Sequence, residues 1–148
     1  MAFGILVAGG EGPGSNSTQL NRPIKVCVDT NENIYVTDND NDRIQRFYSG
    51  SSIGQTIAGH FLGQLFGLGI DLQGNIYVSE YDKSRVTKWM VNATEGILVA
   101  GNETDGVSSS QLNVPTDFQS RESLYYQMVI DKFIRYCCCR YMWNIRIQ

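Results

Sequence analysis

The sequence repeats itself at two fixed displacements, and this repetition restricts the chain to folds that are built from similar units. Residues 4–9, Gly-Ile-Leu-Val-Ala-Gly, recur letter for letter 92 positions later at residues 96–101. Between these copies, residues 33–36, Asn-Ile-Tyr-Val, recur 42 positions later at residues 75–78. A period near 40 residues is typical both of propeller blades and of helical solenoids, so the local pattern must decide between them.

The local pattern favours strands. The apolar residues form short runs rich in Val, Ile, Tyr and Leu, bounded by Gly, Asn or Asp, and in the first unit they fall at residues 24–28, 34–37, 44–47 and 55–58. Polar stretches at residues 29–33 and 71–75 are typical of tight hairpin turns, where Gly74 and the asparagines adopt positive φ at little cost. Four short antiparallel strands in every unit predict an all-β fold with the blades of a β-propeller.

The repeated residues also resemble a known family, the NHL repeat. Each unit has an Asp, three further residues, Asn-Ile-Tyr-Val, an acidic residue, a short polar loop, Arg with Ile or Val, and then an aromatic residue. The resemblance implies blades of a partial, open propeller of the six-bladed kind. It places an outer strand at residues 4–9, blades at residues 23–59 and 65–101, and the start of a third blade at residues 111–118. Within the first blade it implies strands at residues 24–28, 33–38, 43–47 and 55–59. The structural motif residues that it implies are Asp29, Tyr35, Arg43, Asp71, Tyr77 and Arg85.

The repeat region is short for a closed propeller. Residues 4–118 span fewer than three periods, whereas a propeller typically has four to eight blades. A single repeat unit does not bury both of its faces alone. We therefore expect an arc of a larger propeller.

The last thirty residues, 119–148, differ from the repeats. They contain no Gly or Pro, and they carry a net charge of +3, whereas the preceding residues carry −6. Two interpretations stay open. One is an altered reading frame, a retained intron or a misassembled gene product. The other is an amphipathic helix with Tyr126, Val129, Ile130, Phe133 and Cys137 on one face.

The residues that could carry metal or nucleophilic chemistry do not form a site in the sequence. Residues 38–42, Asp-Asn-Asp-Asn-Asp, begin like a calcium loop, but Arg43 and Ser49 stand where Gly and a bidentate Glu are required. We expect a solvated turn there, with Asp38 near Arg43. The adjacent Cys137-Cys138-Cys139 do not provide the spaced pairs of a zinc site, and Cys27 is expected to be a small buried residue. With His60 as the single histidine, we expect no catalytic residue, no metal and no cofactor.

The function that we expect is non-enzymatic: a protein-interaction scaffold that binds its partner through loops. Loops carry recognition because a sheet fixes their ends while their sequence is free to vary. The relevant loops connect an outer strand to the next inner strand, at residues 10–19, 60–61 and 102–110, together with two inter-strand turns. The candidate partner-binding residues in those turns are Asn39, Asp40, Asn41, Asp42, Tyr81, Asp82, Lys83 and Ser84.

Two alternative functions follow from the resemblance. Some similar propellers are lyases or lactonases with a channel metal held by His and acidic residues, but this chain has a single histidine outside the predicted inner strands. Others bind RNA, which requires Lys and Arg to neutralise phosphates, and the repeat region is net acidic. We therefore expect a protein partner rather than a nucleic acid. We also expect no membrane association, because no apolar run reaches the roughly 18 residues of a spanning helix.

Three sequons lie in predicted loops, at Asn16, Asn92 and Asn102. They are possible N-glycosylation sites and point weakly to a secretory context. The opening segment belongs to the repeat and has no preceding positive residue, so we do not interpret it as a signal peptide.

Overall fold

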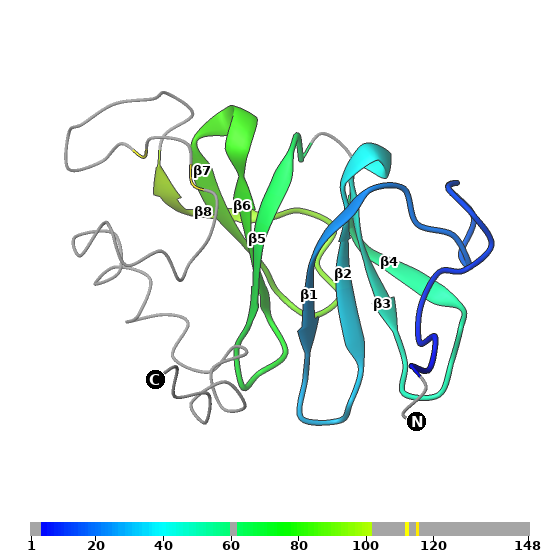
Figure 1. The fold of residues 1–148 in the computed structure, drawn as a ribbon. Coiled ribbons are helices and arrows are strands. Elements are labelled where there is room, and N and C mark those ends of the chain that lie inside the picture. The colour runs from blue at the N-terminus through cyan, green and yellow to red at the C-terminus, as the bar shows by residue number, and fades with distance from the viewer. Residues whose placement is uncertain (1–3, 60–61, 102–111, 113–114, 116–148) are drawn as a thin grey trace, which may run out of the picture.

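Residues 4–59, 62–101, 112 and 115 are described by a computed structural model of the chain. They form two four-stranded antiparallel sheets of the propeller-blade type, with strand orders β1-β2-β3-β4 and β5-β6-β7-β8 (Figure 1). The first sheet contains β1 (Pro23–Val28), β2 (Ile34–Asp38), β3 (Arg43–Phe47) and β4 (Gly54–Gly59). The second contains β5 (Leu65–Ile70), β6 (Ile76–Glu80), β7 (Arg85–Trp89) and β8 (Ile97–Gly101). Short 3-10 turns, η1 (Asn39–Asn41) and η2 (Tyr81–Lys83), join the second and third strands of each sheet.

The predicted all-β fold is confirmed, but one predicted strand is wrong. Residues 4–9 were expected to form an outer strand, yet they have no strand structure, and Ile5 and Leu6 are exposed. The same six letters at residues 96–101 include β8, which pairs with β7. A strand needs a hydrogen-bonded neighbour, and no third strand of a preceding sheet stands beside residues 4–9 in the described part of the chain.

The hairpin turns between β1 and β2 and between β5 and β6 lie at one end of the two sheets (Figure 1). Gly74 has φ +83°, as predicted, but the equivalent residue of the first turn is Glu32, with φ +62°, and not an asparagine. The Asp29 carboxylate accepts hydrogen bonds from the backbone N–H groups of Asn31 and Asn33. These two bonds fix the residues on either side of Glu32 and place it in the left-handed region.

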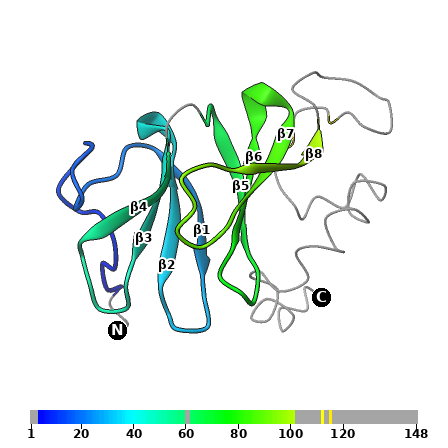
Figure 2. The ribbon, with the colours of Figure 1, turned by 180° about the vertical axis from the view of Figure 1, so that it is seen from behind.

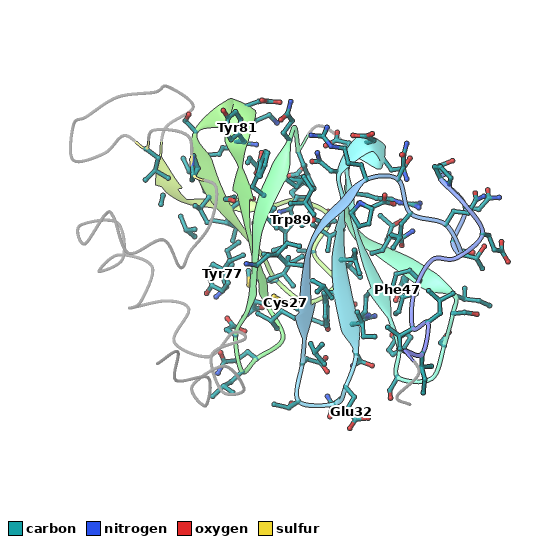
Figure 3. The ribbon with its side chains drawn as sticks, viewed as in Figure 1. Cys27, Glu32, Phe47, Tyr77, Tyr81 and Trp89 are labelled. Carbon is teal, nitrogen blue, oxygen red and sulfur yellow. The ribbon has the colours of Figure 1, made fainter. Side chains whose placement is uncertain are left out.

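One hydrophobic core lies between the two sheets, whose innermost strands β1 and β5 pack against each other (Figure 2). Cys27 and Trp89 lie in this core (Figure 3), and the Cys27 thiol is 3.0 Å from the Leu68 carbonyl oxygen. Cys27 is buried, as predicted. The other buried members of the core are Tyr35, Ile44, Ala58, Leu62, Leu65, Leu68, Ile70, Ile76 and Val78.

Equivalent positions of the two sheets are buried to different extents. Leu68 and Ile70 face the first sheet and are 2% and 5% exposed. Their equivalents on β1, Val26 and Val28, are 53% and 55% exposed. The face of the first sheet that points away from the second is therefore partly open along β1.

The opposite face of the second sheet carries a smaller core. Tyr77 and Val86 pack there with Leu112, much as Tyr35 and Ile44 pack with Leu62 between the sheets. Leu112 and Pro115 are the only described residues of the predicted third unit. The remaining residues of 111–118, and the whole of residues 119–148 with their three adjacent cysteines, lie outside the described residues. Within the described ranges, no helix is long and apolar enough to cross a membrane.

Candidate partner-binding surface

The predicted partner-binding turns lie together at the end of the sheets opposite the hairpin turns (Figure 1). Hydrogen bonds to the linker between β4 and β5 connect them. Asp42 accepts a bond of 2.9 Å from the Gly63 N–H, and the Tyr81 N–H donates to the Gln64 carbonyl at 2.8 Å. We call residues 39–42, 62–64 and 81–84 the turn end. Two of the predicted loops, residues 60–61 and 102–110, lie outside the described residues.

A buried carboxylate fixes the first turn. Asp38 is the last residue of β2, and its side chain is fully buried. It accepts hydrogen bonds from Arg43 Nε at 2.6 Å, Asn41 Nδ2 at 2.9 Å and the Asn21 N–H at 2.6 Å. The prediction that Asp38 lies near Arg43 is therefore confirmed. Charge-assisted bonds of this length hold both ends of the turn in one conformation.

The same Arg43 holds the loop that precedes the first sheet. Its guanidinium donates hydrogen bonds to the carbonyl oxygens of Ser15, Asn16 and Gln19 at 2.6, 3.0 and 3.1 Å. Asn41 Nδ2 donates to the Gly14 carbonyl at 2.8 Å. The loop at residues 10–19 is consequently attached to the first turn along its second half.

Glu80 plays the corresponding part in the second turn. It is fully buried and accepts bonds from Arg85 Nε at 2.9 Å and from the Thr87 hydroxyl at 2.7 Å. Lys83 Nζ lies 3.5 Å from the same carboxylate. The longer side chain of Glu, compared with Asp38, reaches Thr87 on β7. Both turns then close with a residue in the left-handed region, Asp42 with φ +51° and Ser84 with φ +45°.

The eight predicted binding residues differ in their exposure. Asn39 and Ser84 are buried, and Asn39 accepts a bond of 2.7 Å from the Leu65 N–H. Asn41, Asp42, Tyr81 and Lys83 are partly buried, whereas Asp40 and Asp82 are exposed. Most of the predicted residues thus support the turns, and two acidic side chains project from them.

Sequence reasoning did not identify three further residues at or beside the turn end. Arg22 is exposed and lies 3.4 Å from Asp40. The N–H of the exposed Gln64 donates to Asp82 at 3.2 Å. The Phe66 ring lies 5.0 Å from the Tyr81 ring. Arg22 and Gln64 each immediately precede an innermost strand. In the sequence, only this position could have indicated that they lie near the predicted turns.

The remaining motif residues build the hairpin turns at the opposite end. Asp29 accepts hydrogen bonds from Asn33 Nδ2 at 2.9 Å and from the Tyr35 hydroxyl at 3.1 Å. Burial alone raises the pKa of Asp29, but the hydrogen bonds from Asn33, Asn31 and Tyr35 outweigh it and hold the pKa below its ordinary value.

Asp71 repeats this arrangement with Asn75 and Tyr77, at 2.8 and 3.3 Å. Lys88 adds a positive charge 3.5 Å from the Asp71 carboxylate. Burial alone raises the pKa of Asp71, but the hydrogen bonds and this charge hold it below its ordinary value. Both aspartates therefore serve as acceptors inside their own turns.

The other predicted positions add little to the site. Asn16 and Asn92 are exposed, as acceptor asparagines must be. Asn102 and His60 lie outside the described residues. In the part of the chain that the structure covers, no group of three or more His, Cys, Asp or Glu could hold a metal ion.

Comparisons with known proteins agree with the local sequence pattern. Residues 20–47 match the family model of the NHL repeat, so the chain contains this repeat where the first blade was predicted. The search of curated proteins found no match. Among solved structures, the chain is similar to regucalcin from Agrobacterium tumefaciens strain C58, described as a calcium-binding protein, with 15% identity and a TM-score of 0.46. The similarity covers 58% of this chain and 33% of that one, so this chain spans about a third of its length.

Proposed function

We propose that this chain is a non-catalytic, NHL-type arc of a propeller that binds a protein partner through its turn end. The observation that carries this proposal is the two ion pairs made by buried carboxylates, Asp38 with Arg43 and Glu80 with Arg85. They fix both turns while the neighbouring Asp40 and Asp82 stay exposed. A surface that is rigid before binding loses little conformational entropy when it binds.

The division of the polar side chains into internally bonded and exposed ones also supports a binding role. The carboxylates of Asp38 and Glu80, and the side chains of Asn39 and Asp42, are occupied by hydrogen bonds within the chain. What projects is a small polar surface with both charge signs, formed by Asp40, Asp82 and Arg22. Polar and charged groups of both signs are typical of the rim of a protein–protein interface. A phosphate-binding surface would require an excess of Lys and Arg.

The open face along β1 supports the proposal that the two blades belong to a larger arc. Val26 and Val28 are exposed at positions where the second sheet buries Leu68 and Ile70 against its neighbour. An additional blade on this side would cover both valines in the same manner. The turn end would then continue across neighbouring blades as one surface.

Site-specific photocrosslinking in the full chain tests this function. We would place a benzophenone side chain at Asp40 or Asp82 on the turn end, and at Thr30 or Gln73 on the exposed hairpin turns as matched controls. The expected result is a discrete crosslinked protein from the two turn-end positions and none from the controls.

Crosslinks that arise equally at both ends, only at the hairpin turns, or at none of the four positions would contradict the proposal. A crosslinked species that ribonuclease removes would favour the RNA-binding alternative. For a captured partner, the double variant Asp40→Lys, Asp82→Lys should bind at least about tenfold more weakly, whereas Thr30→Lys, Gln73→Lys should bind nearly as wild type.

A further inference from the structure

A cavity of about 260 Å³ lies between the two sheets, toward the hairpin turns and away from the turn end. Its first wall comes from the first sheet and includes Tyr35, Arg46 and Gln55. Its second wall comes from the second sheet and includes Ile76, Trp89 and residues 90–93. These last residues belong to the connection from β7 to β8, which reaches across toward the first sheet (Figure 2).

Arg46 is the charged side chain of this cavity. It lies on β3, in register with Tyr35 on β2 and Gln55 on β4. One of its terminal nitrogens donates to Gln55 Oε1 and to the Tyr48 hydroxyl, both at 2.6 Å. Its Nε is buried and has no hydrogen-bond partner in the described part of the chain. Because Nε has almost no accessible surface, a ligand in the cavity would meet the guanidinium at a terminal nitrogen.

The equivalent residue of the second sheet shows what Arg46 lacks. Lys88 stands 42 positions later and lies 3.5 Å from the carboxylate of Asp71, the aspartate of its own hairpin turn. Arg46 makes no such pair with Asp29, and among the described residues no carboxylate lies within ion-pair distance of it. In the first sheet, the positive charge of Arg46 therefore lines the cavity without a carboxylate partner. In the second sheet, the equivalent charge of Lys88 is paired with Asp71.

We propose that this cavity binds a small monocarboxylate. The carboxylate would accept a charge-assisted hydrogen bond from a terminal nitrogen of Arg46, and the apolar body of the ligand would lie against Trp89 and Ile76. Cavities for drug-sized ligands are typically about 300–1,000 Å³. The smaller cavity here suits a compact ligand with a single ring or a short chain. This site is separate from the turn end and does not depend on the function proposed for it.

Fluorescence of Trp89 tests the site directly. The full chain has two tryptophans, so the variant Trp143→Phe leaves Trp89 as the single reporter. Titration with sodium benzoate should change its fluorescence in a saturable manner. Benzyl alcohol, which has the same ring without the charge, and inorganic phosphate, which has charge without the ring, should each bind at least about tenfold more weakly.

Two further variants, made in the Trp143→Phe protein, test whether Arg46 provides the positive charge that binds the ligand. Arg46→Gln should lower benzoate affinity at least about tenfold, and the matched control Lys88→Gln should keep it within about twofold, since Lys88 faces the other side of its sheet. Far-ultraviolet circular dichroism checks that both variants are folded. As a measurement that needs no variant at residue 46, the Arg46 Nε–H resonance should shift on benzoate addition. Absence of saturation, equal affinity in Arg46→Gln, an unmoved Nε–H resonance, or equal binding of phosphate or benzyl alcohol would overturn the proposal.

Discussion

In each of four turns, a single carboxylate fixes the backbone conformation, and the four turns form two equivalent pairs. Asp29 and Asp71 hold the hairpin turns, and Asp38 and Glu80 hold the turns at the other end. Each accepts several hydrogen bonds from residues within a few positions in the sequence. This explains why so many acidic residues of the repeats have an internal role.

The hairpin aspartates predict a specific dependence of stability on pH. The pKa of Asp29 is below the ordinary 3.8 in the folded chain. Its stabilising contribution is therefore complete above that value and is lost as the pH falls through the lower folded pKa. Asp29→Asn should cost about 1–3 kcal/mol of unfolding free energy at pH 7, and the difference from wild type should shrink at pH values below 3.8. Urea unfolding at several pH values measures it.

The exposed Asp40 provides the control for that series. Asp40→Asn removes a carboxylate whose described ion pair is on the surface, so it should change the unfolding free energy by less than about 1 kcal/mol at any pH. An Asp29→Asn variant as stable as wild type at pH 7, or a cost that persists unchanged in acid, would show that the turn does not depend on the charged carboxylate.

At the scale of the strand, a glycine faces an aromatic ring in each sheet. A Cβ on Gly54 would lie 2.8 Å from the Phe47 ring, and a Cβ on Gly96 would lie 2.6 Å from the Trp89 indole. Both rings are buried, and an added methyl group would overlap with them. Gly54→Ala and Gly96→Ala should each destabilise the chain by about 1–3 kcal/mol in chemical unfolding.

Gly4 is the matched position for those substitutions, because no atom of the other described residues lies within 4 Å of a Cβ placed there. Gly4→Ala should leave the unfolding free energy within about 0.5 kcal/mol of wild type. Equal stability of all three variants would mean that the rings do not pack on the glycines as described.

The strands were largely predictable from the sequence, because apolar runs that recur at one period constrain each other's boundaries. β3 has the predicted bounds, and β1 and β4 each begin one residue earlier than predicted. Residues 4–9 were not predictable in this way, since their letters match β8 but their strand partner is missing from the described residues. Glu32 took the left-handed conformation for a related reason, because the Asp29 side chain outweighs local propensity there.

At the scale of the whole molecule, the repeat produces two sheets with similar residues and unequal burial. Leu68→Ala should cost about 2–5 kcal/mol of unfolding free energy, because it leaves a void between the sheets. The equivalent Val26→Ala should cost about 0.5 kcal/mol or less, since Val26 is half exposed. Similar costs for the two variants would mean that the open face of the first sheet is covered in solution.

The functional surfaces were only partly predictable at this scale. The sequence located the turns of the turn end, because turn residues are recognisable between strands. It did not separate Asp40 and Asp82, which project, from Asn39 and Ser84, which are buried by tertiary contacts. Arg46 and Lys88 occupy equivalent positions in the sequence, and only the structure shows that Lys88 pairs with a carboxylate whereas Arg46 donates to Gln55 and Tyr48.

The face-to-face packing of the two sheets underlies both the continuous turn end and the cavity at Arg46. The most direct test is a proton nuclear Overhauser spectrum of the labelled full chain. Cys27 lies opposite Tyr35 within its sheet and has its sulfur 3.0 Å from the Leu68 carbonyl of the other sheet. Cross-peaks from the Cys27 β protons to protons of both Tyr35 and residues 68–69 are predicted. Cross-peaks to Tyr35 without any to residues 68–69 would show that the sheets form but do not pack as two blades.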